Sequence, residues 1–305
     1  MLTKYLESIE YFVDELNGFR KKRACIDHIH SLSTIVRTRL AENKCTFVCF
    51  VDFQKAFDWV QRDLLQLKLL NAGVDGRFYK ALKSLYSCPV ACVEVNNIQT
   101  DWFSTPFGVK QGDILSPTLF TLYVNDLALE IKESNLGLHL DNLTLGILLY
   151  ADDIALLAES EDDLQKMLNL LQVWCCRWRL SINRSKTQII HFRKKSIPIS
   201  RKIITFGSAT LEFTPEYKYL GFIFDEFMTY EAGTKVLADS AGRALGSVVN
   251  KLKVCKDLGY STYSRLYDAC VSPILNYASG IWGFKECKAA DSIQNRAARC
   301  FLRCS

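Results

Sequence analysis

The hydrophobic positions of the chain form short unbroken runs that alternate with longer periodic segments. Residues 45–52 (CTFVCFVD) are β-branched and aromatic and end at an aspartate, and residues 188–192 form a similar short run. Residues 146–158 (GILLYADDIALLA) hold two apolar runs on either side of a polar break. Runs of this length and composition are typical of buried strands. We therefore predict strands at 45–52 and 188–192, and two strands joined by a tight turn within 146–158.

The longer segments carry apolar residues at helical spacing, and they predict most of the remaining chain as helix. Asn17-Gly18 should separate the first two helices. Near residue 225 the pattern changes from mixed helix and strand to helix alone, which predicts a subdomain boundary. We expect helices over 1–16, from about 18 to 43, from the first strand to about 70, and over 76–87, 117–132, 161–179, 230–254, 261–280 and 288–303.

Turn and cap residues add detail to this outline. Asn96-Asn97 predicts a hairpin within 91–103, and residues 217–224 predict a second small hairpin. Ser116 followed by Pro117 predicts an N-cap and first helical residue. Ser160 should cap the next helix, whose first-turn acids suit the helix dipole and need no catalytic role. The helix after Pro117 should bury one side, formed by Leu119, Phe120, Tyr123, Val124 and Leu127.

Two aspartates, Asp152 and Asp153, occupy the polar break between the two central strands. Neighbouring carboxylates repel by roughly 4 kcal/mol at about 4 Å with an effective dielectric of about 20. A cation is therefore needed to neutralise them. Asp52 ends the other buried strand and could complete such a site, although taken alone it fits a helix cap equally well. Three carboxylates on two buried β-elements can hold two Mg²⁺ ions, an arrangement used for phosphoryl transfer.

Two polar segments further along the chain suggest contact with a ligand. Gly108 and Gly112 flank Lys110-Gln111 and let backbone approach a bound molecule closely. A well-capped core helix would explain the segment that follows, but not the polar pair before it. Arg20 and Arg23 bound a basic cluster at an expected helix start, where cations oppose the dipole. A solvated helix start is one interpretation of this cluster, and a phosphate partner is the one we favour.

Composition narrows the class of protein. The chain has 305 residues, 49% of them hydrophobic, which is ample for a large core. A net charge of +5 suits a nucleic-acid partner if the excess is clustered, and it means little if the excess is spread evenly. In the last expected helix, one face should carry Arg296, Arg299 and Arg303. Twelve scattered cysteines predict reduced thiols inside a cell, with nucleus or cytoplasm left open. No apolar run is long enough to span a membrane, and no membrane partner is expected.

The order of motifs resembles that of reverse transcriptases, most closely those of non-LTR (LINE-like) retrotransposons. The motifs are FVDFQKAFD, GVKQGDILSP, YADD, INRSKT and YLG, in this order. NGFRKKRACIDHI before them and YASGIWG with IQNRAARCFLR after them are also similar to the family. The resemblance implies an α+β, right-hand polymerase palm: an antiparallel sheet with helices packed on one face. It implies partial fingers over 1–45, a palm over 46–225 and a helical thumb-like region over 226–305.

The resemblance also implies a metal and nucleotide site. Asp52 and Asp152 would be the principal ligands of two Mg²⁺ ions, with Mn²⁺ as the alternative. Asp153 would be the third acid, and the carbonyl of Phe53 would add to one metal. The residues expected to serve the incoming dNTP are Phe57 under the sugar, Gln111 and Gly112 against the nucleotide, and Lys186 as general acid for pyrophosphate.

The same resemblance implies partners and a reaction. A DNA primer on an RNA template would be extended from dNTPs, with Tyr219, Leu220 and Gly221 as primer grip. Arg20, Arg23 and Lys110 would contact nucleic acid, and no obligate protein partner is inferred. Family finger residues that grip the triphosphate would precede residue 1, so we expect a chain truncated at both ends. The alternatives are a catalytically silent remnant that binds nucleic acid and a maturase-like RNA-binding protein.

Overall fold

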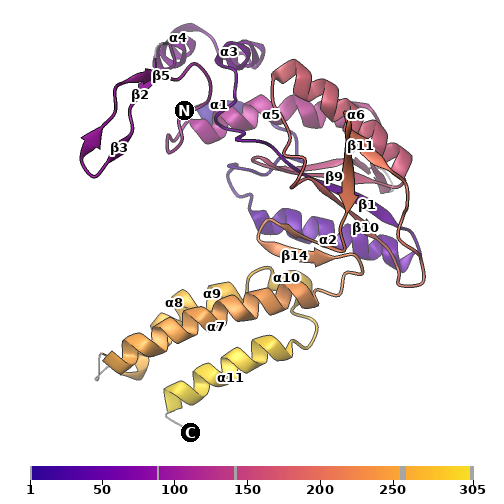
Figure 1. The fold of residues 1–305 in the computed structure, drawn as a ribbon, viewed down its shortest axis with the longest axis vertical. Helices are drawn as coiled ribbons and strands as arrows, with labels where there is room; N and C mark the ends of the chain where they lie inside the picture. Colours follow the sequence, from indigo (N-terminus) through magenta and orange to yellow (C-terminus); the bar gives the residue numbers. More distant parts are fainter. Residues whose placement is uncertain (1, 88, 141–142, 255–258, 303–305) are drawn as a thin grey trace. The chain divides into compact units, whose positions relative to one another are not determined.

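The computed structural model describes residues 2–87, 89–140, 143–254 and 259–302, which divide into two compact units. The first unit comprises residues 1–28, 45–191 and 198–214, and the second comprises 29–44, 192–197 and 215–305. The two units are described separately below. Helix α2 (Cys25–Ala41) and strand β10 (Gln188–Phe192) each contribute residues to both. The predicted α+β class is confirmed (Figure 1).

A six-stranded, mostly antiparallel sheet forms the centre of the first unit. Its order is β11 (Ile204–Phe206), β12 (Ala209–Phe213), β10, β1 (Thr46–Asp52), β9 (Asp153–Ala158) and β8 (Ile147–Tyr150). Strands β1, β9 and β8 pair antiparallel, whereas β10 and β12 pair parallel. The strands predicted at 45–52, within 146–158 and at 188–192 are therefore confirmed.

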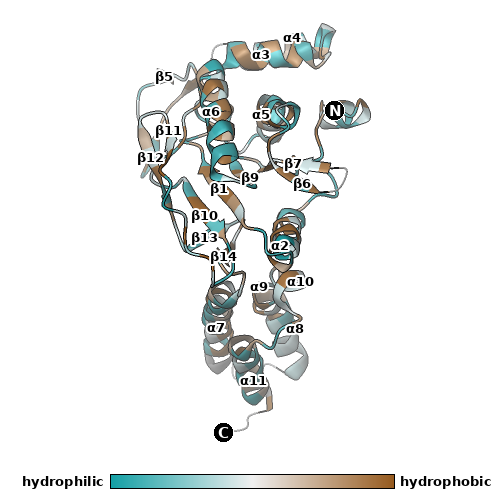
Figure 2. Ribbon diagram, turned by 90° about the vertical axis from the view of Figure 1, so that its right-hand side faces the viewer, coloured by the Kyte–Doolittle hydropathy of each residue, from teal (hydrophilic) through white to brown (hydrophobic). Residues whose placement is uncertain are grey.

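Burial on both faces explains the uninterrupted hydrophobic runs of the central strands. Every residue of β1 before Asp52 is buried, as is every residue of β9 after Asp153. Helices α5 (Ser116–Glu133) and α6 (Glu161–Trp178) pack across one face, where alternate β1 side chains join their core (Figure 1). Figure 2 shows the hydrophobic β1 and the mixed hydrophobic and hydrophilic surface of α6.

The two predicted helix caps have different outcomes. The Ser160 side chain accepts a hydrogen bond from the Asp163 backbone N–H at 3.1 Å, so the cap of α6 is confirmed. The prediction for Ser116 is wrong, because this residue lies inside α5 and its hydroxyl donates to the carbonyl of Lys110 at 2.5 Å. The predicted apolar side of α5 is confirmed, since Leu119, Phe120, Tyr123, Val124 and Leu127 are all buried.

The predicted helix over 1–16 is wrong in extent, because α1 spans only Leu2–Ser8. The following residues pair with the sheet instead. The N–H of Leu149 donates to the carbonyl of Glu15 at 2.8 Å, and the N–H of Asn17 donates to the carbonyl of Leu149 at 2.9 Å. This short parallel bridge continues the sheet beyond β8. Hydrogen bonds to the open edge of β8 therefore replace helical hydrogen bonds in residues 15–17.

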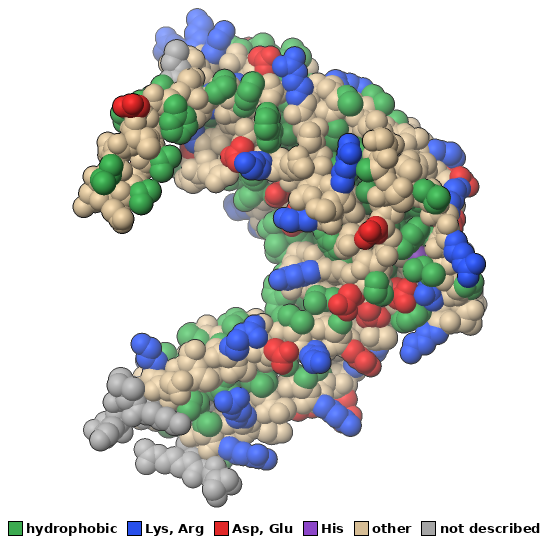
Figure 3. Space-filling model, viewed as in Figure 1, with side chains coloured by type: hydrophobic (Ala, Val, Ile, Leu, Met, Phe, Trp, Pro, Cys, Tyr) green, Lys and Arg blue, Asp and Glu red, His purple; other side chains and the backbone are tan. Residues whose placement is uncertain are grey.

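Helices α3 (Arg62–Asn71) and α4 (Gly76–Leu85) lead to a group of short hairpin strands. Strand β2 (Val90–Ala91) pairs with β5 (Phe103–Ser104), and β3 (Glu94–Val95) pairs with β4 (Ile98–Gln99). Asn96 and Asn97 both have positive φ, as the predicted hairpin turn requires. Figure 3 shows hydrophobic side chains on the surface of this region, which exposes Val90, Val93, Val95, Ile98, Trp102 and Phe103. Strands β6 (Leu138–Leu140) and β7 (Leu143–Leu145) form another small hairpin.

The second unit is a hairpin followed by helices. Strands β13 (Glu216–Tyr219) and β14 (Phe222–Asp225) confirm the hairpin predicted at 217–224. Helices α7 (Glu231–Val254) and α11 (Lys288–Leu302) match their predicted positions, although Arg303 lies outside the described residues. The single helix predicted over 261–280 is wrong. It is divided into α8 (Tyr260–Cys270), α9 (Ser272–Leu275) and α10 (Ser279–Trp282), because Pro273 lacks the N–H needed to continue α8. No helix in the described ranges is long and apolar enough to span a bilayer.

A buried cation ties the helices of the first unit together. Lys68 of α3 is 4% exposed, and its Nζ donates to the Asp126 carboxylate at 2.6 Å and to the Tyr123 carbonyl. The indole N–H of Trp174 donates to the same carboxylate oxygen at 3.0 Å. Burial lowers the pKa of Lys68 to about 8, although Asp126 opposes the shift. Asp126 therefore compensates a charge that the core would otherwise exclude.

We predict that Asp126→Asn lowers the free energy of unfolding by about 2–4 kcal/mol, because Lys68 loses its charge partner in a buried setting. Urea unfolding measures this change. The control is Asp14→Asn, which breaks a solvent-exposed pair with Arg23 and should cost less than about 1 kcal/mol. Equal losses in the two variants would contradict the structural role of the buried pair.

Candidate active site

Backbone pairing brings the three predicted acids to one end of the central sheet. Asp52, the last residue of β1, lies directly opposite Asp153, the first residue of β9. Asp152 precedes Asp153 in the two-residue loop that joins β8 to β9. Asp52 and Asp152 both line a cavity of about 670 Å³. The carboxylates separated by a hundred residues in sequence therefore share one site.

Two neighbouring segments hold this end of the sheet in place. Beside the β8–β9 loop, a Cβ built on Gly18 would lie 2.3 Å from the backbone nitrogen of Ala151, so only glycine fits there. Ala151 itself has a φ of 56°, a conformation that costs a residue with a Cβ roughly 1–2 kcal/mol. Close packing against residue 18 therefore supports a strained loop next to Asp152.

On the other side of the acids, residues 181–183 run along the end of β1. Phe53 and Ile182 form an antiparallel bridge, and the N–H of Asn183 donates to the carbonyl of Asp52 at 2.7 Å. The turn that follows places Nζ of Lys186 3.9 Å from Oδ2 of Asp52. Lys186 is well exposed and also lines the cavity, so its ammonium is accessible to a ligand.

Repulsion among the three carboxylates favours the binding of a positive charge. Loss of hydration, then the neighbouring Asp152 and Asp52 carboxylates, raise the pKa of Asp153 to about 6, although part of the Asp153 surface is open to solvent. Carboxylate and carbonyl oxygens are the ligands that Mg²⁺ prefers. Among the described residues, no three His, Cys, Asp or Glu side chains already converge as a metal cluster. The donor set suits a hard divalent cation, but the side chains are not preassembled around one.

Phe57 forms an apolar wall of the same cavity. Its ring stacks on Phe120 of α5, with centroids 4.6 Å apart, and meets Phe19 edge-on at 6.5 Å. Phe53 is buried, and its backbone lies in the segment that lines the cavity. Packing on two sides restrains the Phe57 ring.

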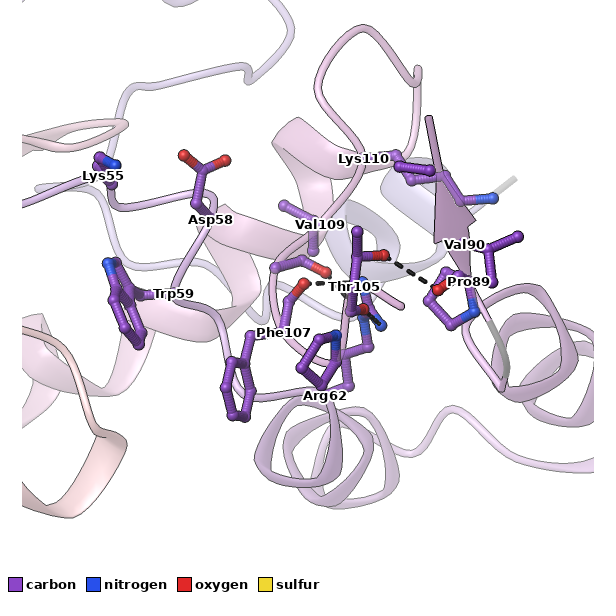
Figure 4. A pocket seen from close by; sticks show the side chains of 13 residues that line it. Lys55, Asp58, Trp59, Arg62, Pro89, Val90, Thr105, Phe107, Val109 and Lys110 are labelled. Atoms are coloured by element: carbon purple, nitrogen blue, oxygen red, sulfur yellow. Dashed lines mark hydrogen bonds between the residues drawn. The ribbon is translucent and has the colours of Figure 1, made fainter. Parts of the chain in front are cut away.

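The segment from Phe107 to Gly112 is attached to the chain just after β1. The side-chain amide of Gln111 donates to the Asp58 carboxylate at 3.0 Å, and the N–H of Val109 donates to the carbonyl of Phe57 at 2.9 Å. Gln111 lines the cavity that Asp52 and Asp152 share, whereas Lys110 lines a neighbouring one (Figure 4). Gly112 has a φ of 85° and open space around it.

Arg62 fixes the start of this segment. Its guanidinium donates to the carbonyls of Gly108 and Phe107 at 2.8 Å each, and to the carbonyl of Thr105 (Figure 4). Neither Arg62 nor Gly18 was identified from the sequence as a contributor to the site. Gly18 lies in an Asn-Gly pair, which signals a turn, but its contact with residue 151 is non-local. For Arg62 the sequence holds no signal beyond a basic residue at a helix start.

The remaining predicted residues lie elsewhere. Arg20 is 11% exposed and makes a paired hydrogen bond to Glu7 at 3.0 Å, with further bonds to the carbonyls of Val13 and Leu16. Its cation therefore has internal partners, and we do not include it in a nucleic-acid surface. Arg23 forms a surface pair with Asp14 at 2.7 Å.

The predicted primer-grip residues belong to the second unit. Tyr219 ends β13 and is buried, and Leu220 and Gly221 form the two-residue turn to β14 with positive φ at both positions. The hydroxyl of Tyr277 donates to the carbonyl of Leu220 at 2.6 Å. The positive φ angles of Leu220 and Gly221 are those of a tight hairpin turn, and the Tyr277 side chain holds the tip of the hairpin.

With the fold and the acids described, comparison with known proteins defines the class. The family model for reverse transcriptase (RNA-dependent DNA polymerase) matches residues 1–224. The chain belongs to the reverse transcriptase family. Enzymes of this family generally use divalent metal ions.

Individual relatives place the chain among retrotransposon proteins and confirm the predicted resemblance. It is 27% identical to the RNA-directed DNA polymerase from mobile element jockey of Drosophila funebris, over 87% of this chain and 29% of the relative. It is 27% identical to the probable RNA-directed DNA polymerase from transposon BS of Drosophila melanogaster, over 95% of this chain and 33% of the relative. A protein of the type-1 retrotransposable element R2 of Nasonia vitripennis is 27% identical over 68% of this chain. The chain thus spans about a third of the length of the first two relatives.

Solved structures support the palm fold. A telomerase from Candida albicans, in complex with a fragment of telomeric RNA, matches with a TM-score of 0.57 at 12% identity, over 99% of this chain and 53% of the telomerase. Apo telomerase from Candida tropicalis matches with a TM-score of 0.55 at 12% identity, over 99% of this chain and 54% of that protein. At this identity the likeness concerns the fold alone.

We predict that Gly18→Ala destabilises the protein by about 1–3 kcal/mol, because the added methyl group overlaps the backbone of residue 151. Urea unfolding measures the loss. Gly246→Ala in α7 is the control, because nothing lies within 4 Å of its added Cβ and alanine favours a helix by about 0.5–1 kcal/mol. A neutral Gly18→Ala would show that residue 18 does not support the loop.

A second prediction concerns pH in the absence of divalent metal. Because the pKa of Asp153 is raised to about 6 in the folded state, the folded protein binds more protons than the unfolded chain between about pH 4 and 6. Stability contributed by the protonated acid is therefore lost as pH rises through this window. Asp153→Asn should raise the melting temperature by about 1–3 °C at pH 7.5, where Asp153 is charged. Near pH 4, where Asp153 is protonated in the folded protein, the melting temperature should not change. Asp101→Asn on the exposed hairpin is the control; a gain that is constant with pH would contradict this explanation.

Proposed function

We propose that this chain is an RNA-directed DNA polymerase domain that transfers nucleotides from dNTPs to a primer 3′-OH on an RNA template. The observation that carries the proposal is the pairing of Asp52 opposite Asp153, with Asp152 in the adjoining loop. Family membership supports the same reaction. The proposal includes an intracellular site of action, in keeping with buried thiols such as those of Cys49 and Cys175.

The acids are proposed to hold two Mg²⁺ ions, with Mn²⁺ as a substitute, through Asp52, Asp152 and the carbonyl of Phe53. Asp153 completes the negative charge of the site. Two ions bound together supply charge stabilisation at the attacking and leaving oxygens of an in-line displacement. Lys186, whose Nζ lies 3.9 Å from Oδ2 of Asp52, is proposed to donate a proton to the departing pyrophosphate.

The walls of the cavity are proposed to select the nucleotide. Phe57 lies against the sugar and disfavours a 2′-OH, because stacking on Phe120 prevents its ring from yielding. Gln111 and Gly112 contact the nucleotide, with Gln111 oriented by Asp58. Lys110 and Arg23 contact phosphates of the template or primer.

The wider organisation follows from the same proposal. Residues 46–225 form the palm, 1–45 contribute part of the fingers, and 226–305 form the thumb. The turn at Tyr219, Leu220 and Gly221 contacts the primer strand. A catalytically silent remnant that binds nucleic acid is the second candidate, favoured by the lack of a preassembled metal cluster among the described residues.

We predict that the purified chain extends a DNA primer on an RNA template in Mg²⁺, and that Asp152→Asn lowers the rate by about 10³-fold, since several kcal/mol of transition-state stabilisation are lost. Primer extension resolved on a gel measures both rates. Asp162→Asn, an exposed acid in the first turn of α6, is the control and should retain full activity. If no metal or salt condition gave extension while the chain still bound the hybrid, the silent remnant would be the correct description.

A further inference from the structure

A second cavity adjoins the catalytic one. It has a volume of about 540 Å³ and lies between the turn after β1, helix α3 and the segments at 89–91 and 105–110 (Figure 4). Lys55 and Trp59 line both this cavity and the catalytic cavity, so the two cavities are neighbours at these residues. Lys110 and Asp58 are the lining residues with a role proposed above, and the aromatic residues of the cavity wall have none.

Two aromatic side chains form one wall. The rings of Trp59 and Phe107 have centroids 6.1 Å apart and an interplanar angle of 23°. Figure 4 shows the pair side by side, with Lys55 beyond Trp59. Trp59 is 47% exposed and Phe107 is 45% exposed, so neither side chain is buried in the hydrophobic core. A parallel aromatic pair left open to solvent offers planar surface to a ligand.

The pair is held in place by the backbone. Arg62 donates to the carbonyls of Phe107, Gly108 and Thr105, and the N–H of Gly108 donates to the carbonyl of Val60 at 2.8 Å. The N–H of Trp59 donates to the carbonyl of Lys55 at 3.2 Å. The backbone that carries both rings is therefore held by hydrogen bonds. Less conformational entropy of this segment is then lost when a ligand binds.

The charge around the wall is suited to phosphate. Lys55 and Lys110 line the cavity and are exposed, and neither forms a salt bridge within the described ranges. The Nζ of Lys110 lies over the Tyr86 ring, 5.9 Å from its centroid. The Arg62 guanidinium is occupied by carbonyls. Asp58, the acid in the lining, accepts the Gln111 amide. A stacking surface with exposed lysines at its rim is the combination that binds unpaired nucleic acid without sequence preference.

We propose that Trp59 and Phe107 form a stacking platform for a base of single-stranded RNA, with Lys55 and Lys110 contacting its phosphates. The assignment of that RNA as the unpaired template next to the catalytic cavity rests on the proposed polymerase function. The binding of an unpaired strand to the platform does not depend on the polymerase function.

The test is equilibrium binding of a fluorescein-labelled, unstructured 12-nucleotide RNA to the full chain, followed by anisotropy. Trp59→Ala and Phe107→Ala should each weaken binding roughly 10-fold, within the range for loss of one base–aromatic stack. Trp59→Phe should retain most of the affinity. The matched control is Trp102→Ala, which removes a tryptophan that is 67% exposed but outside the cavity, and it should leave binding unchanged.

Salt dependence gives an independent measurement. Lys110→Gln should reduce the slope of log affinity against log salt by about 0.7, as expected for one lost phosphate contact to a single strand. Unchanged binding in Trp59→Ala, or an equal loss in Trp102→Ala, overturns the platform. Full competition by the free mononucleotide at the concentration of RNA also overturns it, because the cavity would then hold a nucleotide and not a strand.

Parallel primer-extension assays separate this inference from the proposed function. A chain that extends no primer but loses RNA affinity in Trp59→Ala and Phe107→Ala would refute the polymerase and support the platform. A chain that extends primers, with RNA affinity and template KM unchanged in both variants, would support the polymerase and refute the platform.

Discussion

The antiparallel pairing of β1 with β9 is the interaction on which the active site depends. It sets Asp52 opposite Asp153 through backbone hydrogen bonds, so the meeting of the acids does not rely on any side-chain contact. The unfavourable charge that results is borne by the hydrophobic burial of both strands over the rest of their length. The free energy gained by burying the strands thus offsets the repulsion between the carboxylates at their ends. A rigid scaffold commonly offsets the cost of a strained or charged site in this way.

Segments from four parts of the chain extend this pairing to either side. Residues 15–18 support the β8–β9 loop, and residues 181–183 lie along the end of β1. The loop at 107–112 is joined to the turn after β1 by backbone bonds and by Arg62. Each motif is therefore held by a neighbour that is distant in sequence, which explains why the site is spread over more than half of the chain.

Local signals made much of this predictable from the sequence. The apolar runs identified the central strands, Ser160 identified a cap, and Asn96-Asn97 identified a turn, because each depends on neighbours along the chain. The helix predicted across Pro273 missed a local signal, but the other errors share a cause. The edge pairing of Leu16, the hydroxyl of Ser116 directed to Lys110, and the roles of Gly18 and Arg62 all depend on contacts or geometry that periodicity does not contain. The roles of the predicted site residues stay predictions that chemistry must test.

The burial of β1 on both faces has a consequence for the gene that encodes it. Side chains alternate along a strand, so losing or gaining a single residue between Thr46 and Val51 would turn Asp52 to the opposite face of the sheet. An in-frame deletion of one codon here would abolish the geometry of the acids, whereas many conservative replacements would preserve it. Among copies of such a gene, length changes in this strand should therefore be the scarcest class of surviving variation.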